Sequence, residues 1–156
     1  MASEAPKMAP ADIPLNSMLT FRLSRLHLRL NAQAARILKE SSGLSLMQWR
    51  VFVMLETVGQ IAPSEMVRRT GFDKGQLSRV IKGMIKEGLV RSVSSESDQR
   101  LHLIDITEKG AALFEQARPH MRSRQNHLLD SLTDSERAAI FKAMDKLELA
   151  MEELED

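Results

Sequence analysis

Residues 71–110 read GFDKGQLSRVIKGMIKEGLVRSVSSESDQRLHLIDITEKG, and the spacing of apolar residues changes within this stretch. Apolar side chains first recur every three or four residues, which predicts a helix from Asp73 to Glu87 with one buried face. The residues of that face are Leu77, Val80, Ile81, Met84 and Ile85. After Gly88 the segments LVRSVS and LHLIDI, separated by polar SESDQR, predict a two-stranded β-hairpin. Because SESDQR has no Asn-Gly pair, we expect a loop longer than two residues.

A shorter helix is predicted immediately before the helix that begins at Asp73. Pro63 suits the first turn of a helix over Ser64–Thr70, where a missing amide hydrogen costs nothing. Gly71 ends that helix, and Asp73 caps the next one with Gln76 at its third position. Two helices joined by a turn that contains glycine form a helix-turn-helix, whose second helix enters the major groove of DNA.

The second helix presents polar and basic side chains opposite its apolar face. The candidate DNA contacts there are Lys74, Gln76, Ser78, Arg79, Lys82 and Lys86. Arginine can bind guanine through two hydrogen bonds, glutamine can do the same with adenine, and serine can serve either base, whereas lysine mainly neutralises phosphate. Gln76, Ser78 and Arg79 are therefore the candidate base readers. A surface helix with solvated charges is the alternative interpretation.

Two helices are predicted before this centre. The first runs from Leu15 to about Glu40, carries Arg22, Arg25 and Arg29 on one face, and is ended by Gly43. The second follows a capping box of Ser45 and Gln48 and is apolar nearly all round, which is typical of a core helix. Residues 1–14 have no apolar signal core and are interpreted as a flexible arm.

Two further helices are predicted after the hairpin. Thr107 caps the first, and Pro119 is expected to kink it or split it in two. Thr133 and Glu136 form a capping box for the last helix. That helix carries a heptad seam of Ile140, Met144, Leu147, Met151 and Leu154. The seam needs a partner surface, which is either a second copy of the chain or the preceding helix.

Composition narrows the class of protein. A chain of 156 residues is the size of one domain, and the absence of cysteine excludes disulfides and thiolate chemistry and favours the cytoplasm. Residues 62–100 carry eight basic and five acidic side chains, whereas residues 101–156 carry seven and twelve. A basic middle beside an acidic tail favours phosphate contact in the middle, although ordinary solvated faces give the same pattern.

Three separated motifs make the chain resemble the MarR family of transcriptional regulators. They are Lys86-Glu87-Gly88-Leu89-Val90, Asp98-Gln99-Arg100 and Ile106-Thr107-Glu108-Lys109-Gly110. The resemblance implies a mainly α fold with a small β-hairpin: a winged helix-turn-helix over about 45–107 with dimerisation helices over about 15–41 and 108–155, all in one domain over 15–156. It also implies that Arg100 enters the minor groove, whose narrow forms attract arginine, while Asp98 holds the wing in place.

The resemblance further implies a small ligand held between the dimerisation helices and the DNA-binding lobe. The candidate effector contacts are Arg22, Ser24, Arg25, His27, Arg29, Met47 and Trp49. Arginine can clamp a carboxylate through two hydrogen bonds, so an aromatic carboxylate or an acyl thioester is the expected effector. The alternative is that Trp49 belongs to the core and that the arginines are solvated or paired with the acidic tail.

The predicted function is that of a ligand-responsive repressor that binds an inverted-repeat operator as a homodimer. Its rival is a helical dimerisation or adaptor protein that keeps the winged-helix shape without binding DNA. An enzyme is not expected, because the chain has no phosphate-binding glycine loop, nucleophile motif or metal motif. No cofactor, metal or membrane partner is expected either.

Overall fold

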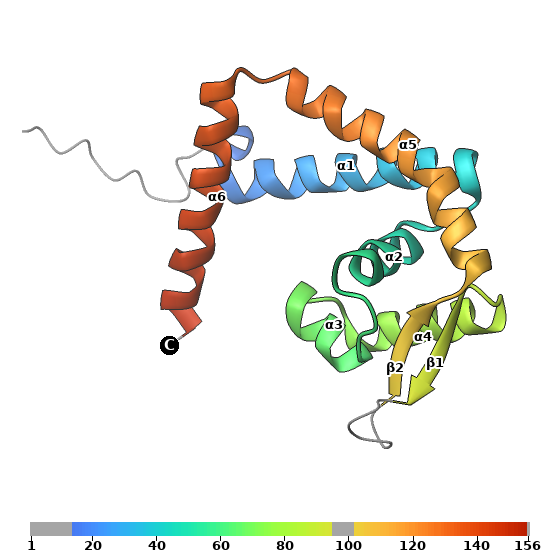
Figure 1. The fold of residues 1–156 in the computed structure, drawn as a ribbon. Helices are drawn as coiled ribbons and strands as arrows, with labels where there is room; N and C mark the ends of the chain where they lie inside the picture. Colours follow the sequence, from blue (N-terminus) through green and yellow to red (C-terminus); the bar gives the residue numbers. More distant parts are fainter. Residues whose placement is uncertain (1–13, 95–101, 156) are drawn as a thin grey trace, which may run out of the picture.

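The computed structural model describes residues 14–94 and 102–155. Its elements are η2 (Leu15–Ser17), α1 (Leu19–Ser42), α2 (Leu46–Val58), α3 (Pro63–Thr70), α4 (Lys74–Lys86), β1 (Val90–Ser94), β2 (His102–Ile106), α5 (Glu108–Asp130) and α6 (Asp134–Glu155) (Figure 1). The fold is mainly helical with one antiparallel hairpin, which confirms the predicted fold class. The expected N-terminal arm lies outside the described residues except for Pro14.

The core lies where α2 meets the neighbouring helices and the hairpin. It is formed by side chains of α1 and α5 together with those of the lobe that contains α2, α3, α4, β1 and β2 (Figure 1). Its largest fully buried side chains are Phe52, Leu38, Met66, Leu77, Met84, Val51 and Val90. They come from α1, α2, α3, α4 and β1, so one cluster fixes the helix-turn-helix and the hairpin together. The predicted core role of the second helix is confirmed for its buried face, although Val53 on the opposite face is 39% exposed.

The helix ends follow the predicted caps. The Ser45 hydroxyl accepts from the Gln48 N–H at 3.2 Å while the Gln48 side chain accepts from the Ser45 N–H at 2.8 Å. Thr107 caps α5 by accepting from the Gly110 N–H at 3.1 Å. Gly43 ends α1 with a φ of 74°, a left-handed conformation that glycine adopts without a steric penalty.

The hairpin pairs Val90 with Ile106 and Ser94 with His102 in an antiparallel register. An isolated bridge joins Ile104 to Ile61, just before α3. This bridge attaches the hairpin to the helix-turn-helix, as a wing beside a recognition helix requires. Because β1 ends at Ser94 and β2 begins at His102, the connection is longer than a two-residue turn, as predicted.

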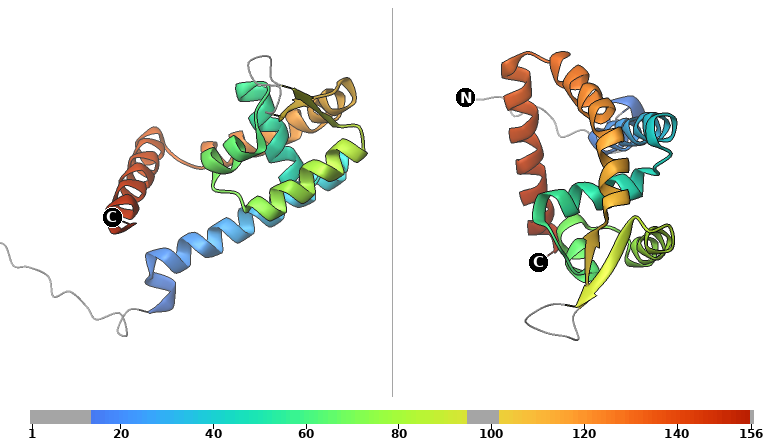
Figure 2. Two further views of the ribbon diagram at one scale, coloured as in Figure 1. Left: turned by 90° about the horizontal axis from the view of Figure 1, so that it is seen from below. Right: turned by 45° about the vertical axis from the view of Figure 1, so that its right-hand side comes forward.

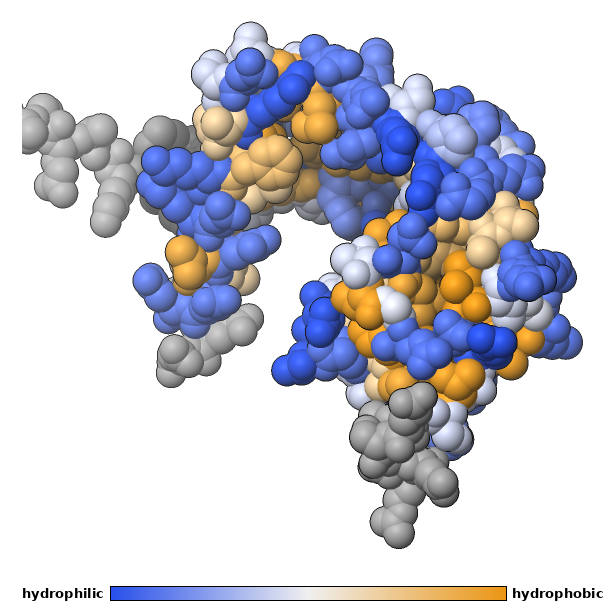
Figure 3. Space-filling model, in the orientation of Figure 1, coloured by the Kyte–Doolittle hydropathy of each residue, from blue (hydrophilic) through white to orange (hydrophobic). Residues whose placement is uncertain are grey.

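Helices α1 and α5 pack along each other, whereas α6 stands apart from the lobe (Figure 1; Figure 2, left). The space-filling view shows an open space between α6 and the lobe (Figure 3). Four predicted seam residues, Ile140, Met144, Leu147 and Met151, are 37–57% exposed. The seam therefore does not pack against α5 of its own chain. The side chain of the fifth, Leu154, is not among those that the structure describes.

Two sequence predictions are wrong in detail, and one of the two outcomes expected at Pro119 is excluded. The first helix does not begin at Leu15: a short 3-10 turn, η2, precedes α1, which starts at Leu19. Ile85 was expected in the buried face of α4 but is 41% exposed, since it lies at the margin of that face. Of the two outcomes expected at Pro119, a kink or a split, the split does not occur, because α5 is one helix from Glu108 to Asp130. A proline inside a helix removes one hydrogen bond and can kink the helix without ending it. The helix changes direction along its length (Figure 1).

Candidate nucleic-acid interface

The recognition helix α4 is oriented by its buried side. Leu77, Ile81 and Met84 are at most 4% exposed and turn that side toward the core. The opposite side is left at the surface. All six α4 side chains predicted to touch DNA are exposed: Lys74, Gln76, Ser78, Arg79, Lys82 and Lys86. Of these, Arg79, Lys82 and Lys86 follow one strip of the helix surface, at spacings of three and four residues.

The start of α4 is fixed by its cap and by the turn before it. The Asp73 carboxylate accepts from the Gln76 N–H at 2.6 Å, which confirms the predicted cap. Gly71 ends α3 with a φ of 66°. An Nη atom of Arg79 lies 3.7 Å from the position that a Cβ atom at Gly75 would take. The guanidinium of Arg79 therefore lies near the first turn of α4, the part of a recognition helix that reaches bases.

Two arginines at the end of α3 were missed by the sequence reasoning. Arg68 donates to the Glu65 carboxylate through Nε and Nη2, each at 2.8 Å, and Arg69 donates through Nε at 2.6 Å. Hydrogen bonds from Arg69 and Arg68 hold the pKa of Glu65 below its ordinary value of 4.5. The adjacent basic pair inside the first helix of a helix-turn-helix was the available signal, since that helix crosses the DNA backbone.

The described part of the wing contains an ion pair between its two strands. Arg91 and Asp105 are paired across the two strands, with Nη2 of Arg91 2.6 Å from Oδ2 of Asp105. The two wing residues predicted to act at the DNA, Asp98 and Arg100, lie outside the described residues. Their assignment stays a prediction.

The residues predicted to bind an effector do not form one pocket. Arg22, Arg25 and Arg29 line a shallow groove on the N-terminal half of α1, together with exposed leucines. Ser24 is exposed on the same half, and His27 is within hydrogen-bond distance of Asn31. Trp49 and Met47 instead lie on α2, and the Trp49 ring packs against Phe114 of α5 at a centroid distance of 4.8 Å. Helical spacing shows which residues share a face but not which helix covers it.

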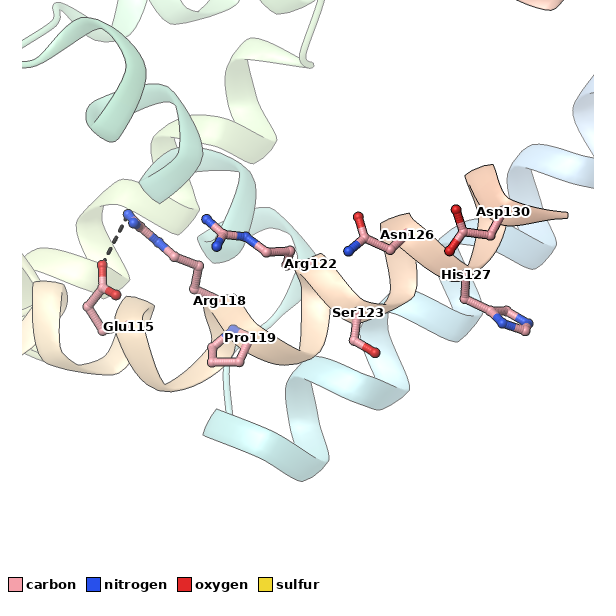
Figure 4. Close-up of a pocket in the computed structure, with 8 residues that line it drawn as sticks. All are labelled: Glu115, Arg118, Pro119, Arg122, Ser123, Asn126, His127 and Asp130. Carbon is pink, nitrogen blue, oxygen red and sulfur yellow. Dashed lines mark ion pairs between the residues drawn. The ribbon is translucent and has the colours of Figure 1, made fainter. Parts of the chain in front are cut away.

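A second groove joins α2 to α5 around this aromatic pair. Its apolar surface comes from Trp49, Val53, Phe114 and Met121. Arg118 and Arg122 of α5 also line it, and they point to the same side of that helix in Figure 4. Sequence reasoning missed both arginines, although their spacing of four residues on one helix face was visible.

The two arginines of this groove differ in their partners. Arg118 is 2.5 Å from Glu56 and 3.0 Å from Glu115, and its guanidinium carbon lies 4.8 Å from the centre of the Phe114 ring. Arg122 is exposed and has no ion pair with any residue that the structure describes. Its guanidinium can therefore bind an anion without first losing a carboxylate partner. The α2–α5 groove thus combines an aromatic surface with the guanidinium of Arg122, which no described carboxylate neutralises.

Other kinds of site find no support in the described residues. Over residues 14–94 and 102–155 no group of three or more histidine, aspartate or glutamate side chains is arranged to hold a metal ion. None of the helices in these ranges has the length and apolar character that crossing a membrane requires.

Sequence comparison finds a family model and relatives that share this architecture. Residues 42–101 match the model of the MarR family. Multiple antibiotic resistance protein MarR of Salmonella typhimurium is 27% identical over 131 residues, which cover 80% of this chain and 90% of that protein. The matched segment of the family model spans α2, α3, α4 and β1.

Solved structures share the fold over most of the chain. A MarR/EmrR family transcriptional regulator from Acinetobacter sp. ADP1 has a TM-score of 0.82 at 21% identity, over 90% of this chain and 99% of that one. A mutant MarR from E. coli complexed with operator DNA has a TM-score of 0.69 at 24% identity, over 87% and 99%. Bordetella bronchiseptica BpsR, in a study of how 6-hydroxynicotinic acid regulates its DNA binding, has a TM-score of 0.73 at 22% identity, over 87% and 96%.

Proposed function

Because the chain belongs to the MarR family of transcriptional regulators, we propose that it binds an inverted-repeat operator as a homodimer and that a small anionic ligand controls this binding. The family and the named relatives are regulators, not enzymes. The observation that carries the proposal is the exposed strip of Arg79, Lys82 and Lys86 on a helix whose opposite side is buried and whose start is capped.

This strip has the chemistry that duplex DNA requires. Lysine and arginine neutralise phosphates and release counterions, while side chains near the start of the helix reach base edges. Arg79 and Gln76 supply the donors that suit guanine and adenine, respectively. Arg68 and Arg69 add positive charge on the neighbouring helix, although Glu65 neutralises part of it. The E. coli relative solved with operator DNA supports the same use of the fold.

Exposed apolar side chains support assembly into a homodimer. Besides the α6 seam, Leu19, Leu23 and Leu26 of α1 are 44–53% exposed. Apolar surface of this extent on a small chain marks an interface. A second copy offers the same surfaces, and a two-fold pair then presents two α4 helices to DNA. The expected operator is an inverted repeat with half-sites on the order of 34 Å apart.

The α2–α5 groove is the place where an effector fits best. An aromatic ring can pack on Trp49 and Phe114 while its carboxylate binds the guanidinium of Arg122. The arginines of α1 are a weaker candidate site, because their groove contains no aromatic stacking pair. BpsR, whose DNA binding 6-hydroxynicotinic acid regulates, supports an aromatic carboxylate as the class of ligand.

Repression is the expected direction of control, because a small dimer acts most simply by occupying a promoter. The test is fluorescence anisotropy of the full chain with the duplex upstream of its own gene and with a scrambled duplex, over a range of salt concentrations. We expect tighter binding to the upstream duplex and a steep loss of affinity with salt. Equal and negligible affinity for both duplexes would reject the proposal and favour the adaptor alternative.

A further inference from the structure

Residues at the start of α5 form hydrogen bonds with the chain just after the end of the recognition helix. Nζ of Lys109 donates to the Glu87 carbonyl at 2.7 Å, and the hydroxyl of Thr107 donates to the Gly88 carbonyl at 2.7 Å. The backbone N–H of Thr107 donates to the Leu89 carbonyl at 3.2 Å. Carbonyls at a helix C-terminus lack partners within the helix, and a lysine is favoured there by the helix dipole. These contacts, which we call the α4–α5 junction, satisfy three successive carbonyls.

Gly110 makes this junction unusually close. It is buried, and a Cβ atom at this position would lie 2.0 Å from the Leu89 carbonyl oxygen and 3.1 Å from Ile106. A carbonyl oxygen of the backbone cannot move away as a flexible side chain can. Any side chain at Gly110 therefore has to push α5 away from the turn that ends α4.

The opposite end of α4 is held by contacts of a different kind, in addition to its Asp73 cap. Phe72, just before the Asp73 cap, has the Arg50 guanidinium carbon 6.0 Å from its ring centre, at the outer limit of a cation–π contact. Arg50 in turn donates to the side chain of Asn31 on α1 at 2.8 Å. Hydrogen bonds from Thr107 and Lys109 thus fix the C-terminal end of α4, whereas its start is fixed by the Asp73 cap and by an aromatic contact.

Helix α5 leads from the junction to the part of the fold that carries α1. Arg124 on α5 donates to the Gln33 side chain at 3.1 Å and to the Leu30 carbonyl at 2.9 Å. A change in the direction of α5 relative to α1 is therefore conveyed to the end of α4 through the junction.

We propose that Lys109 and Gly110 are positioning residues for DNA reading: they hold the last turn of α4 against the first turn of α5, so that the direction of α5 sets the direction of the recognition helix. This inference rests on the proposed binding of operator DNA. Neither side chain needs to touch DNA for the effect, because a shift of α4 at its end displaces the base-reading residues at its start.

The test compares Lys109→Met with Lys109→Arg and with a matched control, Lys142→Met on α6. Each full-length variant is titrated with the upstream duplex and the scrambled duplex at several salt concentrations, after circular dichroism has confirmed its fold. For Lys109→Met we expect the preference for the upstream duplex to fall by roughly tenfold, the cost of about one lost base contact, with an unchanged salt dependence on scrambled DNA. Lys109→Arg should restore the preference, since a guanidinium also donates to a carbonyl, and Lys142→Met should retain it.

Two outcomes would overturn the positioning role. An equal loss of affinity for both duplexes in Lys109→Met, with a shallower salt dependence, would indicate that Lys109 contacts phosphate instead. An unchanged preference in both Lys109→Met and Gly110→Ala would show that the junction does not set the direction of α4. If the unmodified chain itself shows no preference, the proposed function has failed instead.

Hydrogen exchange gives a readout of the junction that does not depend on DNA. The N–H of Leu89 donates to the Met84 carbonyl at 2.8 Å, and that of Gly88 to the Ile85 carbonyl at 3.0 Å. We expect both amides to exchange faster in Lys109→Met than in Lys142→Met. Equal exchange rates in the two variants would contradict the proposed role of Lys109 in holding the end of α4.

Discussion

Arg91 and Asp105 stand opposite each other on β1 and β2, with Nη2 of the arginine 2.6 Å from Oδ2 of the aspartate. The pair neutralises a cation on the wing, the part of the fold that is expected to lie beside the DNA. The side chain of Arg91 is 64% exposed, so the pair itself adds little to stability. Its larger effect is on the charge that the wing offers to phosphate.

Removing the negative partner should therefore strengthen DNA binding. In Asp105→Asn we expect higher affinity for any duplex and a steeper salt dependence, by about one released counterion, because Arg91 becomes available to phosphate. The matched control is Asp145→Asn on α6, which changes the net charge equally but far from the wing. Anisotropy titrations at several salt concentrations measure both, and an equal gain in the two variants would count against a role for Arg91 at the DNA.

Arg79 and Lys82 should differ in the kind of binding that they support. Arg79→Ala is expected to lower affinity for the upstream duplex by about 1–3 kcal/mol while scrambled DNA is affected far less. Lys82→Ala should weaken both duplexes alike and reduce the salt dependence. Titrations of both variants with both duplexes measure these affinities. An equal loss of affinity for the two duplexes in Arg79→Ala would show that Arg79 does not read bases.

The sequence predicted the elements of the lobe because their signals are local. The caps at Ser45, Asp73 and Thr107 lie where the helices begin, and the change of period after Gly88 marks the hairpin. Such signals involve residues a few positions apart, so they need no knowledge of the tertiary fold.

Contacts between residues that are far apart in the sequence could not be predicted. Trp49 and Phe114 are separated by four intervening elements, and no spacing rule connects them. Similarly, apolar periodicity identified one face of α6 but allowed two partners for it. The candidate effector residues were for that reason taken from α1 and the start of α2, and the contribution of α5 to the groove beside Trp49 was not foreseen.

The α6 seam should be required for assembly but not for the folding of one chain. Met144 is 42% exposed and lies outside the core cluster, so Met144→Glu leaves that core intact. We expect light scattering to show a dimer for the unmodified protein and a monomer for this variant, with a matching loss of operator affinity. Lys142→Glu changes charge on the opposite side of α6 and should stay dimeric. A dimeric Met144→Glu protein would place the interface elsewhere.

Glu65 should make stability depend on pH in the acid range. Hydrogen bonds from Arg69 and Arg68 lower its pKa in the folded chain below the ordinary 4.5, so its contribution is present above that value and is lost as pH falls through the lowered pKa. We therefore expect the unmodified chain to unfold at a slightly higher temperature than Glu65→Gln at neutral pH. This difference in unfolding temperature should disappear as the pH falls into the acid range. A difference that does not change with pH would contradict this assignment.

The α2–α5 groove and the α1 groove make opposite predictions for ligand binding. Trp49 is the only tryptophan in the chain, so its fluorescence reports a ligand that packs on it. Titration with a panel of aromatic acids and acyl thioesters should change this fluorescence for at least one compound. Arg122→Gln should weaken that binding by roughly tenfold or more, because a charge-assisted pair with the carboxylate is lost. Arg22→Gln removes the same charge on α1 and should leave the affinity unchanged. The reverse result, with loss of binding only in Arg22→Gln, would move the effector site to the arginines of α1.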